Sequence, residues 1–375
     1  MKTKLWVWLT LLPGMNPEKI TALLEHFESI EEIYHAEREE YQSVPGIRRT
    51  DCEALCHKSL EAAEKVIRRM EELGGTILHY EDARYPALLT KMTDPPYVLY
   101  LLGRLVQWEK IFPIGVVGTR EHSEYGKKAA EYICTELAER GAAIVSGMAQ
   151  GLDAVAANAA LSVGGYTIAV LGSGVDRPYP ARNMELYRRI IEHGTILSEY
   201  PPGTAPLGYH FPQRNRIISG LSYGIVAIEA PESSGVLITA QYALENGRDV
   251  FVVPGSIFSY QSRGANRLIQ QGAKLVTCAQ DVLDEYSYQL QNLEPVQRTK
   301  KQPEKQITIA EERLSGLSEE ERCVVLALSE KALHIDQLKL KCGMMMDALN
   351  AILPMLEIYG LIQKMPGDNY QLLIG

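Results

Sequence analysis

Short apolar runs alternate with helical stretches through the middle of the chain, from residue 111 to residue 277. The candidate strands are Ile114–Val117, Ala142–Val145, Thr167–Leu171, Ile196–Ser198, Gly224–Ile228, Val250–Val253 and Leu275–Thr277. Helical segments such as Tyr125–Arg140 and Asn183–His193 lie between them. Strands that are apolar on both faces and alternate with helices are typical of a parallel sheet covered by helices. We therefore predict an α/β fold built on a parallel sheet.

The turn that follows Ala142–Val145 has the composition of an anion site. Ser146–Gly147 interrupts the apolar run, Gly151 follows, and an alanine-rich helix begins at Leu152. A strand, a glycine-bearing turn and a helix together direct free backbone N–H groups at an anion. Any α/β crossover has a similar layout, and a glycine-rich turn is weak evidence by itself. Phosphate binding and a plain crossover therefore remain alternatives for this turn.

Other candidate strands are also followed by glycine, serine and arginine. Arg120 comes just after the run that ends at Gly118, Phe211–Leu221 contains two arginines, and Ser233–Ala240 is a small-residue turn leading into a helix. Ligands of such sheets bind outside the carboxyl ends of the strands, so these segments are expected to form one site. The predicted phosphate contacts are Gly118, Thr119, Arg120, Ser123, Lys127, Ser146, Gly147, Gln150, Gly151, Phe211, Arg214, Asn215 and Arg216.

The arginines carry the predicted chemistry of this site. A guanidinium is planar, always charged and offers forked donors that match phosphate. Arg120, Arg214 and Arg216 are expected on converging loops, whereas an arginine on an isolated loop is usually only solvated. Tyr209–Phe211 lies just before the arginine pair, and bases stack on aromatic rings while phosphates pair with cations. Single-stranded nucleic acid is therefore the predicted ligand, with Lys127 widening the basic patch and a core role as the alternative for Phe211.

The sequence offers little for catalysis or for a cofactor. The dinucleotide fingerprint GxGxxG is absent, since Gly172–Gly174 leads into Asp-Arg-Pro and not into a helix. No paired carboxylates, nucleophile–base pair or metal-ligand cluster stands out, and Glu199 and Glu229 are the nearest candidate carboxylates. We predict that the chain is not an enzyme and needs no cofactor or metal.

Charge and cysteine content limit the possible partners and compartments. The net charge of -9 leaves room only for a local basic site, not for a chain coated with nucleic acid. The six cysteines form no CxxC pair, which favours free thiols and a cytoplasmic protein. No apolar run is long enough to span a membrane, and Leu5–Leu12 is interpreted as a domain's first helix and not as a signal peptide.

Six blocks of the sequence resemble those of the DprA/Smf family of DNA-processing proteins, in the family's order. They read GTREHSEYG, SGMAQGLD, FPQRNRIISGLS, SSGVLITA, VVPGS and GANRLIQQGA. The resemblance covers Leu78–Asp284 closely and both flanks loosely. It implies an extended Rossmann-like domain that binds single-stranded DNA, protects incoming DNA in natural transformation and delivers RecA recombinase onto the strand. It also implies a homodimer formed through this domain.

Two positions depart from that family's pattern. Gln150 stands where many members have lysine, so one candidate phosphate contact is neutral. Ala157 stands where the family usually has histidine, a residue that we interpret as structural there. DNA affinity is therefore expected to be lower than in other members or to depend on other residues.

The flanks predict two further domains. Residues 1–75 have an all-helical pattern that resembles a SAM or helix-hairpin-helix domain, with Pro-Gly turns at Pro13–Gly14 and Pro45–Gly46. Such turns hold the DNA backbone through glycine amides in that module, but nearby glutamates make plain packing turns the favoured alternative. Residues 76–286 are assigned to the Rossmann-like domain, and residues 287–316 to a polar linker.

Residues 317–375 read as three helices and a hairpin, an order that resembles a winged helix. The third helix, Met344–Tyr359, carries Asp347 and Glu357 but neither lysine nor arginine. A helix that reads bases between phosphates needs positive charge, so we do not expect this one to read the major groove.

Two functions from different classes remain open. The first is a non-enzymatic protein that binds single-stranded DNA. The second is a small-nucleotide-binding or nucleotide-cleaving protein, because the sheet and turns also resemble Rossmann-type hydrolases that carry PGGxGTxxE. Alignment on Thr239 places Tyr242 where those hydrolases have their glutamate, so the carboxylate needed for N-glycosidic cleavage is missing there.

Overall fold

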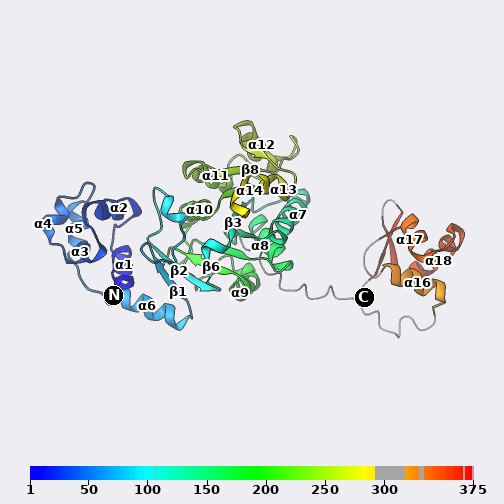
Figure 1. Ribbon diagram of the computed structural model, residues 1–375, viewed down its shortest axis with the longest axis horizontal. Coiled ribbons are helices and arrows are strands. Elements are labelled where there is room, and N and C mark those ends of the chain that lie inside the picture. Colours follow the sequence, from blue (N-terminus) through cyan, green and yellow to red (C-terminus); the bar gives the residue numbers. More distant parts are fainter. Residues whose placement is uncertain (106, 292–316, 329–332, 366–367, 374–375) are drawn as a thin grey trace. The chain divides into compact units, whose positions relative to one another are not determined.

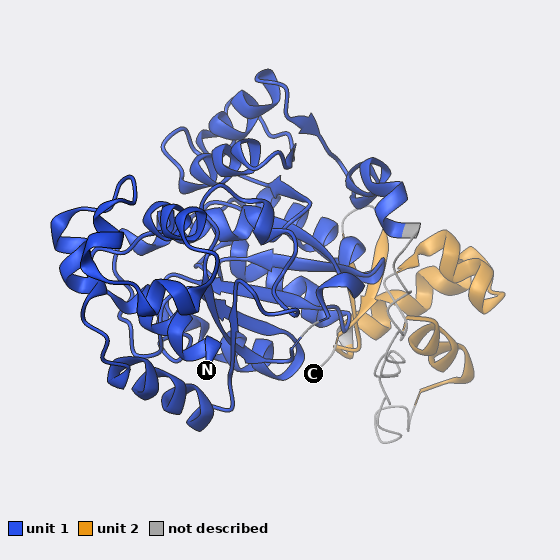
Figure 2. Ribbon diagram, turned by 60° about the vertical axis from the view of Figure 1, so that its left-hand side comes forward, with its two compact units in different colours: residues 1–297 blue, residues 298–375 orange. Residues whose placement is uncertain are grey.

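The computed structural model describes the chain except for residues 106, 292–316, 329–332, 366–367 and 374–375. The chain divides into two compact units, residues 1–297 and 298–375 (Figure 2). Each unit has a hydrophobic core of its own and is described by itself.

The first unit begins with helices, as the sequence predicts (Figure 1). They are α1 (Lys2–Leu11), α2 (Pro17–His26), α3 (Ile30–His35), α4 (Arg38–Gln42), α5 (Arg49–Leu55) and α6 (Glu61–Glu72). The side chain of Asn16 accepts the N–H of Lys19 at 3.0 Å and caps α2, and Pro17 occupies its first turn. Gly14 and Gly46 lie in the two Pro-Gly turns with φ of 79° and 83°, which favours glycine.

These helices share a core with one edge of the sheet. The ring of Trp6 in α1 stacks on Tyr97 with centroids 5.7 Å apart, and the hydroxyls of Thr21 and Tyr97 are hydrogen-bonded at 2.7 Å. Leu5 to Leu9 are all buried. The helical segment is therefore packed against the sheet domain over a continuous apolar surface.

The sheet has nine strands in the order β1-β2-β6-β5-β4-β3-β7-β8-β9. They are β1 (Thr76–His79), β2 (Val98–Gly103), β3 (Phe112–Val117), β4 (Ala142–Ser146), β5 (Thr167–Leu171), β6 (Thr195–Ser198), β7 (Gly224–Ala227), β8 (Asp249–Val252) and β9 (Lys274–Leu275). Strands β3 to β9 are parallel, while β2 runs antiparallel to both β1 and β6. This arrangement confirms the predicted Rossmann-like parallel sheet and adds β2 to it, whose antiparallel direction the sequence did not predict.

Helices cover both faces of the parallel part. The helices are α7 (Glu124–Glu139), α8 (Leu152–Ser162), α9 (Met184–His193), α10 (His210–Gly220), α11 (Gly235–Glu245), α12 (Arg263–Gln270), α13 (Ala279–Leu283) and α14 (Ser287–Gln291). Side chains of α7, α8 and α13 share one core cluster with the sheet, and side chains of α10, α11 and α12 share another. The short runs are apolar on both sides because the strands are buried on both faces.

Two expectations from sequence need correction or restriction. The arginine-bearing segment Phe211–Leu221 is not a loop but most of helix α10. The first residues of the expected linker, Ser287–Gln291, form the short helix α14, and the rest of it lies outside the described residues.

The strand order reverses between β3 and β7, which are neighbours in the sheet. From β3 the chain proceeds through β4 and β5 to β6 on one side, whereas β7 leads to β8 and β9 on the other. The loops that follow the carboxyl ends of β3 and β7 therefore lead in opposite directions and leave a crevice between them. Such a crevice is the usual position of a ligand in sheets of this kind.

The second unit has the elements of a winged helix, which confirms the prediction. They are α16 (Glu319–Leu328), β10 (Leu333–His334), α17 (Ile335–Cys342), α18 (Met346–Ile358), β11 (Ile362–Met365) and β12 (Asn369–Leu372). The three strands are ordered β10-β12-β11. Leu349, Leu353 and Leu356 of α18 are buried against the other helices, while Asp347 and Glu357 are exposed.

Candidate functional site

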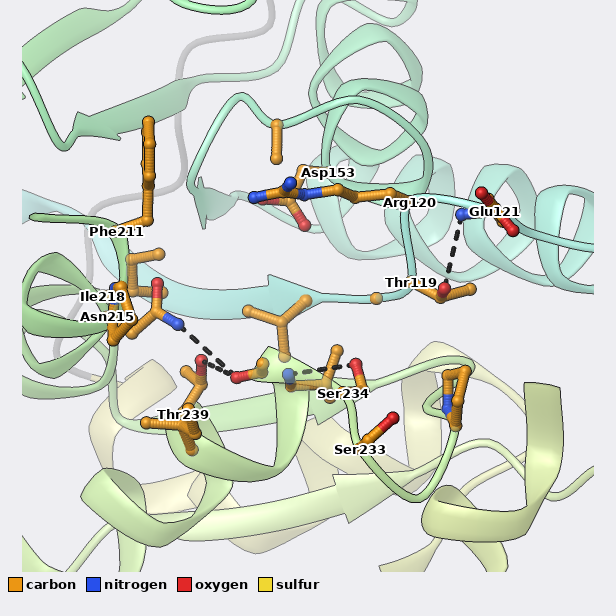
Figure 3. A pocket seen from close by; sticks show the side chains of 18 of the residues that line it. Thr119, Arg120, Glu121, Asp153, Phe211, Asn215, Ile218, Ser233, Ser234 and Thr239 are labelled. Atoms are coloured by element: carbon orange, nitrogen blue, oxygen red, sulfur yellow. Dashed lines mark hydrogen bonds between the residues drawn. The ribbon is translucent and has the colours of Figure 1, made fainter. Parts of the chain in front are cut away.

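The crevice at the reversal of strand order is a cavity of about 730 Å³ (Figure 3). Its walls come from the loop after β3, the start of α8, helix α10, the loop after β7 with the start of α11, and residues 260–261. The residues that line it include Thr119, Arg120, Glu121, Asp153, Tyr179, Phe211, Arg214, Asn215, Ser233, Ser234 and Tyr260.

Arg120 stands on a fixed backbone at the mouth of this crevice. The N–H of Thr119 donates to the carbonyl of Glu229 at 2.9 Å, which ties the loop to the end of β7. A Cβ on Gly151 would lie 2.4 Å from the carbonyl oxygen of Thr119, and φ of Gly151 is 89°, so only glycine allows this close approach. The side chain of Arg120 is exposed and extends over Asp153 in Figure 3.

Glu229 orders the part of the same loop that contains Ser123. Its buried carboxylate accepts the N–H of Ser123 at 2.9 Å and the hydroxyl of Ser123 at 2.6 Å. The Ser123 hydroxyl oxygen in turn accepts the N–H of Gly126 and caps α7. Ser123 therefore orders the loop, and it does not line the crevice.

The Ser146–Gly151 turn uses most of its polar groups inside the protein. The hydroxyl of Ser146 donates to the carbonyl of Val116 at 2.7 Å. The N–H of Gly147 donates to the carboxylate of Asp153 at 3.1 Å, so this amide already has an acceptor. Gln150 is half-buried. The turn shapes the wall of the crevice beside Arg120.

Arg214 is a buried partner of this turn. Only 4% of it is exposed, and its guanidinium donates to the carbonyls of Gly147 and Val170. Burial lowers the pKa of Arg214 to about 10, against the attraction of Asp153, so Arg214 stays charged at neutral pH. Burial raises the pKa of Asp153, against the attraction of Arg214 and of backbone N–H groups. Arg214 and Asp153 together hold the Ser146–Gly151 turn in place between the carboxyl ends of β4 and β5.

Arg216 points elsewhere and does not line the crevice. Its guanidinium pairs with Glu199 at 2.6 Å and with Asp94 at 3.3 Å, and it donates to the carbonyl of Asp94 at 2.8 Å. Residues two apart on a helix face different directions, so α10 separates Arg214 from Arg216. The expectation that both arginines flank one ligand depended on a loop that the structure does not contain.

The crevice does bring Arg120 together with Phe211 and Asn215. Phe211 packs against the ring of Tyr179, with centroids 5.4 Å apart, and the side-chain amide of Asn215 donates to the carbonyl of Gly235 at 3.5 Å. Gly118 and Thr119 also line it, whereas Lys127 is half-buried on α7 outside the lining. Figure 3 shows Arg120 and Asp153 on one wall and Ser233, Ser234 and Thr239 on the other.

Some lining residues were not among the predicted contacts. Ser233 and Ser234 belong to a small-residue turn that the sequence had singled out, and their place after β7 was the available signal. Tyr179 lies in a loop and Tyr260 begins the short 3-10 helix Tyr260–Ser262, both without a recognisable motif, and only the fold brings them to the crevice.

A parallel sheet whose strand order reverses beside a crevice defines a Rossmann-like ligand-binding protein. The chain belongs to the DprA/Smf family. The family model described as DNA recombination-mediator protein A matches residues 76–287, the DprA winged helix domain matches 309–368, and a SAM-like helix-hairpin-helix tandem matches 9–57.

Individual relatives agree with this assignment. The DNA processing protein DprA of Bacillus subtilis is 42% identical over 221 residues, which is 59% of this chain and 74% of that protein. The Smf protein of Synechocystis is 33% identical over 402 residues, which is 98% of each chain.

Two solved structures have the same fold. DprA from Streptococcus pneumoniae is 38% identical with a TM-score of 0.68, over 76% of this chain and 99% of that one. DprA from Helicobacter pylori, described for its unique single-stranded DNA binding mode, is 29% identical with a TM-score of 0.52, over 57% of this chain and 96% of that one.

Proposed function

We propose that the crevice binds single-stranded DNA without strong sequence preference. The carrying observation is that an exposed arginine on a fixed loop, Arg120, lies in the same cavity as the ring pair of Phe211 and Tyr179. Phosphates of a single strand pair with cations while its bases stack on rings. A relative whose described property is single-stranded DNA binding shares the fold, which supports the same ligand class here.

In this proposal the protein protects incoming DNA in natural transformation and delivers RecA recombinase onto it, as a cytoplasmic homodimer. Membership of a family of recombination mediators supports the role in recombination. The homodimer of this proposal forms through the sheet domain, as the resemblance to the family implies. The described residues contain no helix long and apolar enough to cross a membrane.

A nucleotide-cleaving enzyme on this fold has less support. The carboxylate of Glu199 forms an ion pair with Arg216, and the carboxylate of Glu229 accepts two hydrogen bonds from Ser123. Both candidate carboxylates therefore have partners inside the protein and are not directed at a ligand. In the described part of the chain no three His, Cys, Asp or Glu side chains are grouped so that they could hold a metal.

The test is binding of fluorescent oligo-dT and of a blunt duplex of equal length at several salt concentrations. We expect tighter binding of the single strand and a steep loss of affinity with salt, because phosphate contacts release counterions. Equal or tighter binding of the duplex would contradict the proposal. Release of free base from nucleotides by the full chain would favour the enzymatic alternative.

A further inference from the structure

Two of the most exposed apolar side chains belong to the loop that follows β8. Phe258 is 89% exposed and Ile257 is 77% exposed. Because β8 is parallel to β7, and β7 to β3, this loop begins at the same edge of the sheet as the crevice. Tyr260, only two residues after Phe258, lines the crevice. The apolar tip of the loop is thus continuous with the proposed DNA site.

The loop is held in place by hydrogen bonds to α12 and within the loop itself. At its base, the N–H of Gly255 donates to the side chain of Asn266 at 3.2 Å, and that side chain donates back to the carbonyl of Gly255 at 3.0 Å. At its tip, the N–H of Ser259 donates to the carbonyl of Ser256 at 3.0 Å. Phe258 is therefore presented to solvent by an ordered turn.

The side chains around this tip suit a nucleic-acid strand. The guanidinium of Arg263 lies 5.9 Å from the centre of the Tyr260 ring, and Arg267 on the same helix is also exposed. Aromatic rings beside guanidinium groups form the stacking platforms of proteins that bind single strands. The acidic residues that oppose such a strand include Glu121, which lines the same crevice, and Glu232, next to the lining residue Ser233, and both are exposed.

We propose that residues 256–260 form a second contact for the single strand bound in the crevice, where Phe258 and Tyr260 stack on its bases. This inference rests on the proposed function and extends the strand's path from Arg120, across the crevice, to the loop after β8. Arg120 supplies the phosphate contact, and the loop supplies contacts to bases.

The experiment measures fluorescence anisotropy of the full-length chain on labelled oligo-dT and on a matched strand of abasic residues. Phe258→Ala should weaken binding of oligo-dT about tenfold, within the range for one base stacked on an aromatic ring. On the abasic strand Phe258→Ala and the unmodified chain should bind alike, because no base is present to stack. Phe258→Leu keeps an apolar side chain without a ring and should remain weak on oligo-dT.

Control variants separate this inference from the proposed function. Tyr288→Ala removes another exposed aromatic, in α14, and should bind like the unmodified chain. If Arg120→Ala weakens binding but Phe258→Ala does not, the loop contact is wrong and the crevice proposal stands. If neither variant changes affinity, both are wrong.

A contact between copies of the chain is the competing explanation for an exposed apolar tip. Sedimentation of Phe258→Ala should give the same oligomeric state as the unmodified chain. An altered oligomeric state, or full rescue of DNA affinity by Phe258→Leu, would overturn base stacking in favour of a protein–protein contact.

Discussion

Arg120 combines a fixed backbone with a free side chain. Thr119 and Gly151 hold its loop against β7 and α8, and the guanidinium extends over the crevice. A positioned guanidinium loses less freedom on binding than a flexible lysine, so Arg120 should contribute more than Lys127.

Arg120→Ala should lower single-strand affinity by about 1.5–3 kcal/mol, the range for a hydrogen bond to a charged group. The salt slope should flatten by about 0.7, the value for one phosphate on a single strand. Lys127→Ala should cost less than half as much. Fluorescence anisotropy at several salt concentrations measures both effects, with a thermal melt as control. Unchanged affinity in Arg120→Ala would remove this residue from the site.

Arg216 has the opposite character, because its charge is used inside the protein. It is buried, and both Glu199 and Asp94 lose their cation if it is replaced. The carboxylates that remain are partly exposed, 39% for Asp94 and 23% for Glu199, so water compensates part of the loss. Arg216→Ala should therefore destabilise the first unit by about 1–3 kcal/mol, the range for hydrogen-bond partners left unsatisfied. Urea unfolding measures this loss. A stable Arg216→Ala chain with weakened DNA binding would restore the sequence-based assignment of Arg216 as a phosphate contact.

Among the elements, the contact between α1 and β1 carries a pH dependence. His79 of β1 is buried, stacks on Trp6 of α1 at 6.1 Å, and its Nδ1 has no hydrogen-bond partner among the described residues. Burial lowers the pKa of His79, although Asp82 and Glu81 oppose this effect. The folded chain therefore binds a proton at His79 less readily than the unfolded chain does.

Protonation at His79 thus favours the unfolded chain, and stability should fall as pH decreases from about 7 to about 5, around its ordinary pKa of about 6.5. His79→Phe should reduce this slope by no more than about 1.4 kcal/mol per pH unit, the limit for one proton. Urea unfolding followed by tryptophan fluorescence reports on the first unit, which contains Trp6, Trp8 and Trp108. His193→Gln is the exposed control, and an unchanged slope in His79→Phe would show that His79 is not responsible.

At the scale of the whole molecule, the two units are expected to divide their tasks. The second unit has its own core, and its exposed α18 residues include Asp347, Met355 and Glu357. Acidic and apolar side chains suit a protein contact better than the phosphates of DNA. We therefore propose a protein-contact or regulatory role for the second unit.

Deletion of residues 317–375 should leave most of the single-strand affinity in place, because the proposed contacts all lie in the first unit. Anisotropy on oligo-dT, compared with the full chain, measures this. A loss of more than about tenfold, or about 1.4 kcal/mol, would place part of the DNA site in the second unit.

The sequence alone determined the elements and the family. Apolar periodicity is local, so β4, β5, α7 and α9 could be located within a residue or two, and six ordered blocks identified the family. The position of Arg120 at the carboxyl end of a strand could also be predicted, because Arg120 comes just after the apolar run that ends at Gly118. These features depend on residues that are neighbours in the chain, so the sequence by itself contains the information that predicts them.

Only the tertiary structure decided which polar residues remain free to bind a ligand. Arg214 and Arg216 look alike in sequence, yet one clamps the Gly147 turn and the other pairs with Glu199. Tyr260 carried no motif, and it lines the crevice because β8 lies beside β7 in the sheet. Burial and partnership depend on segments far apart in the chain, and the phase of one helix decides where each side chain points.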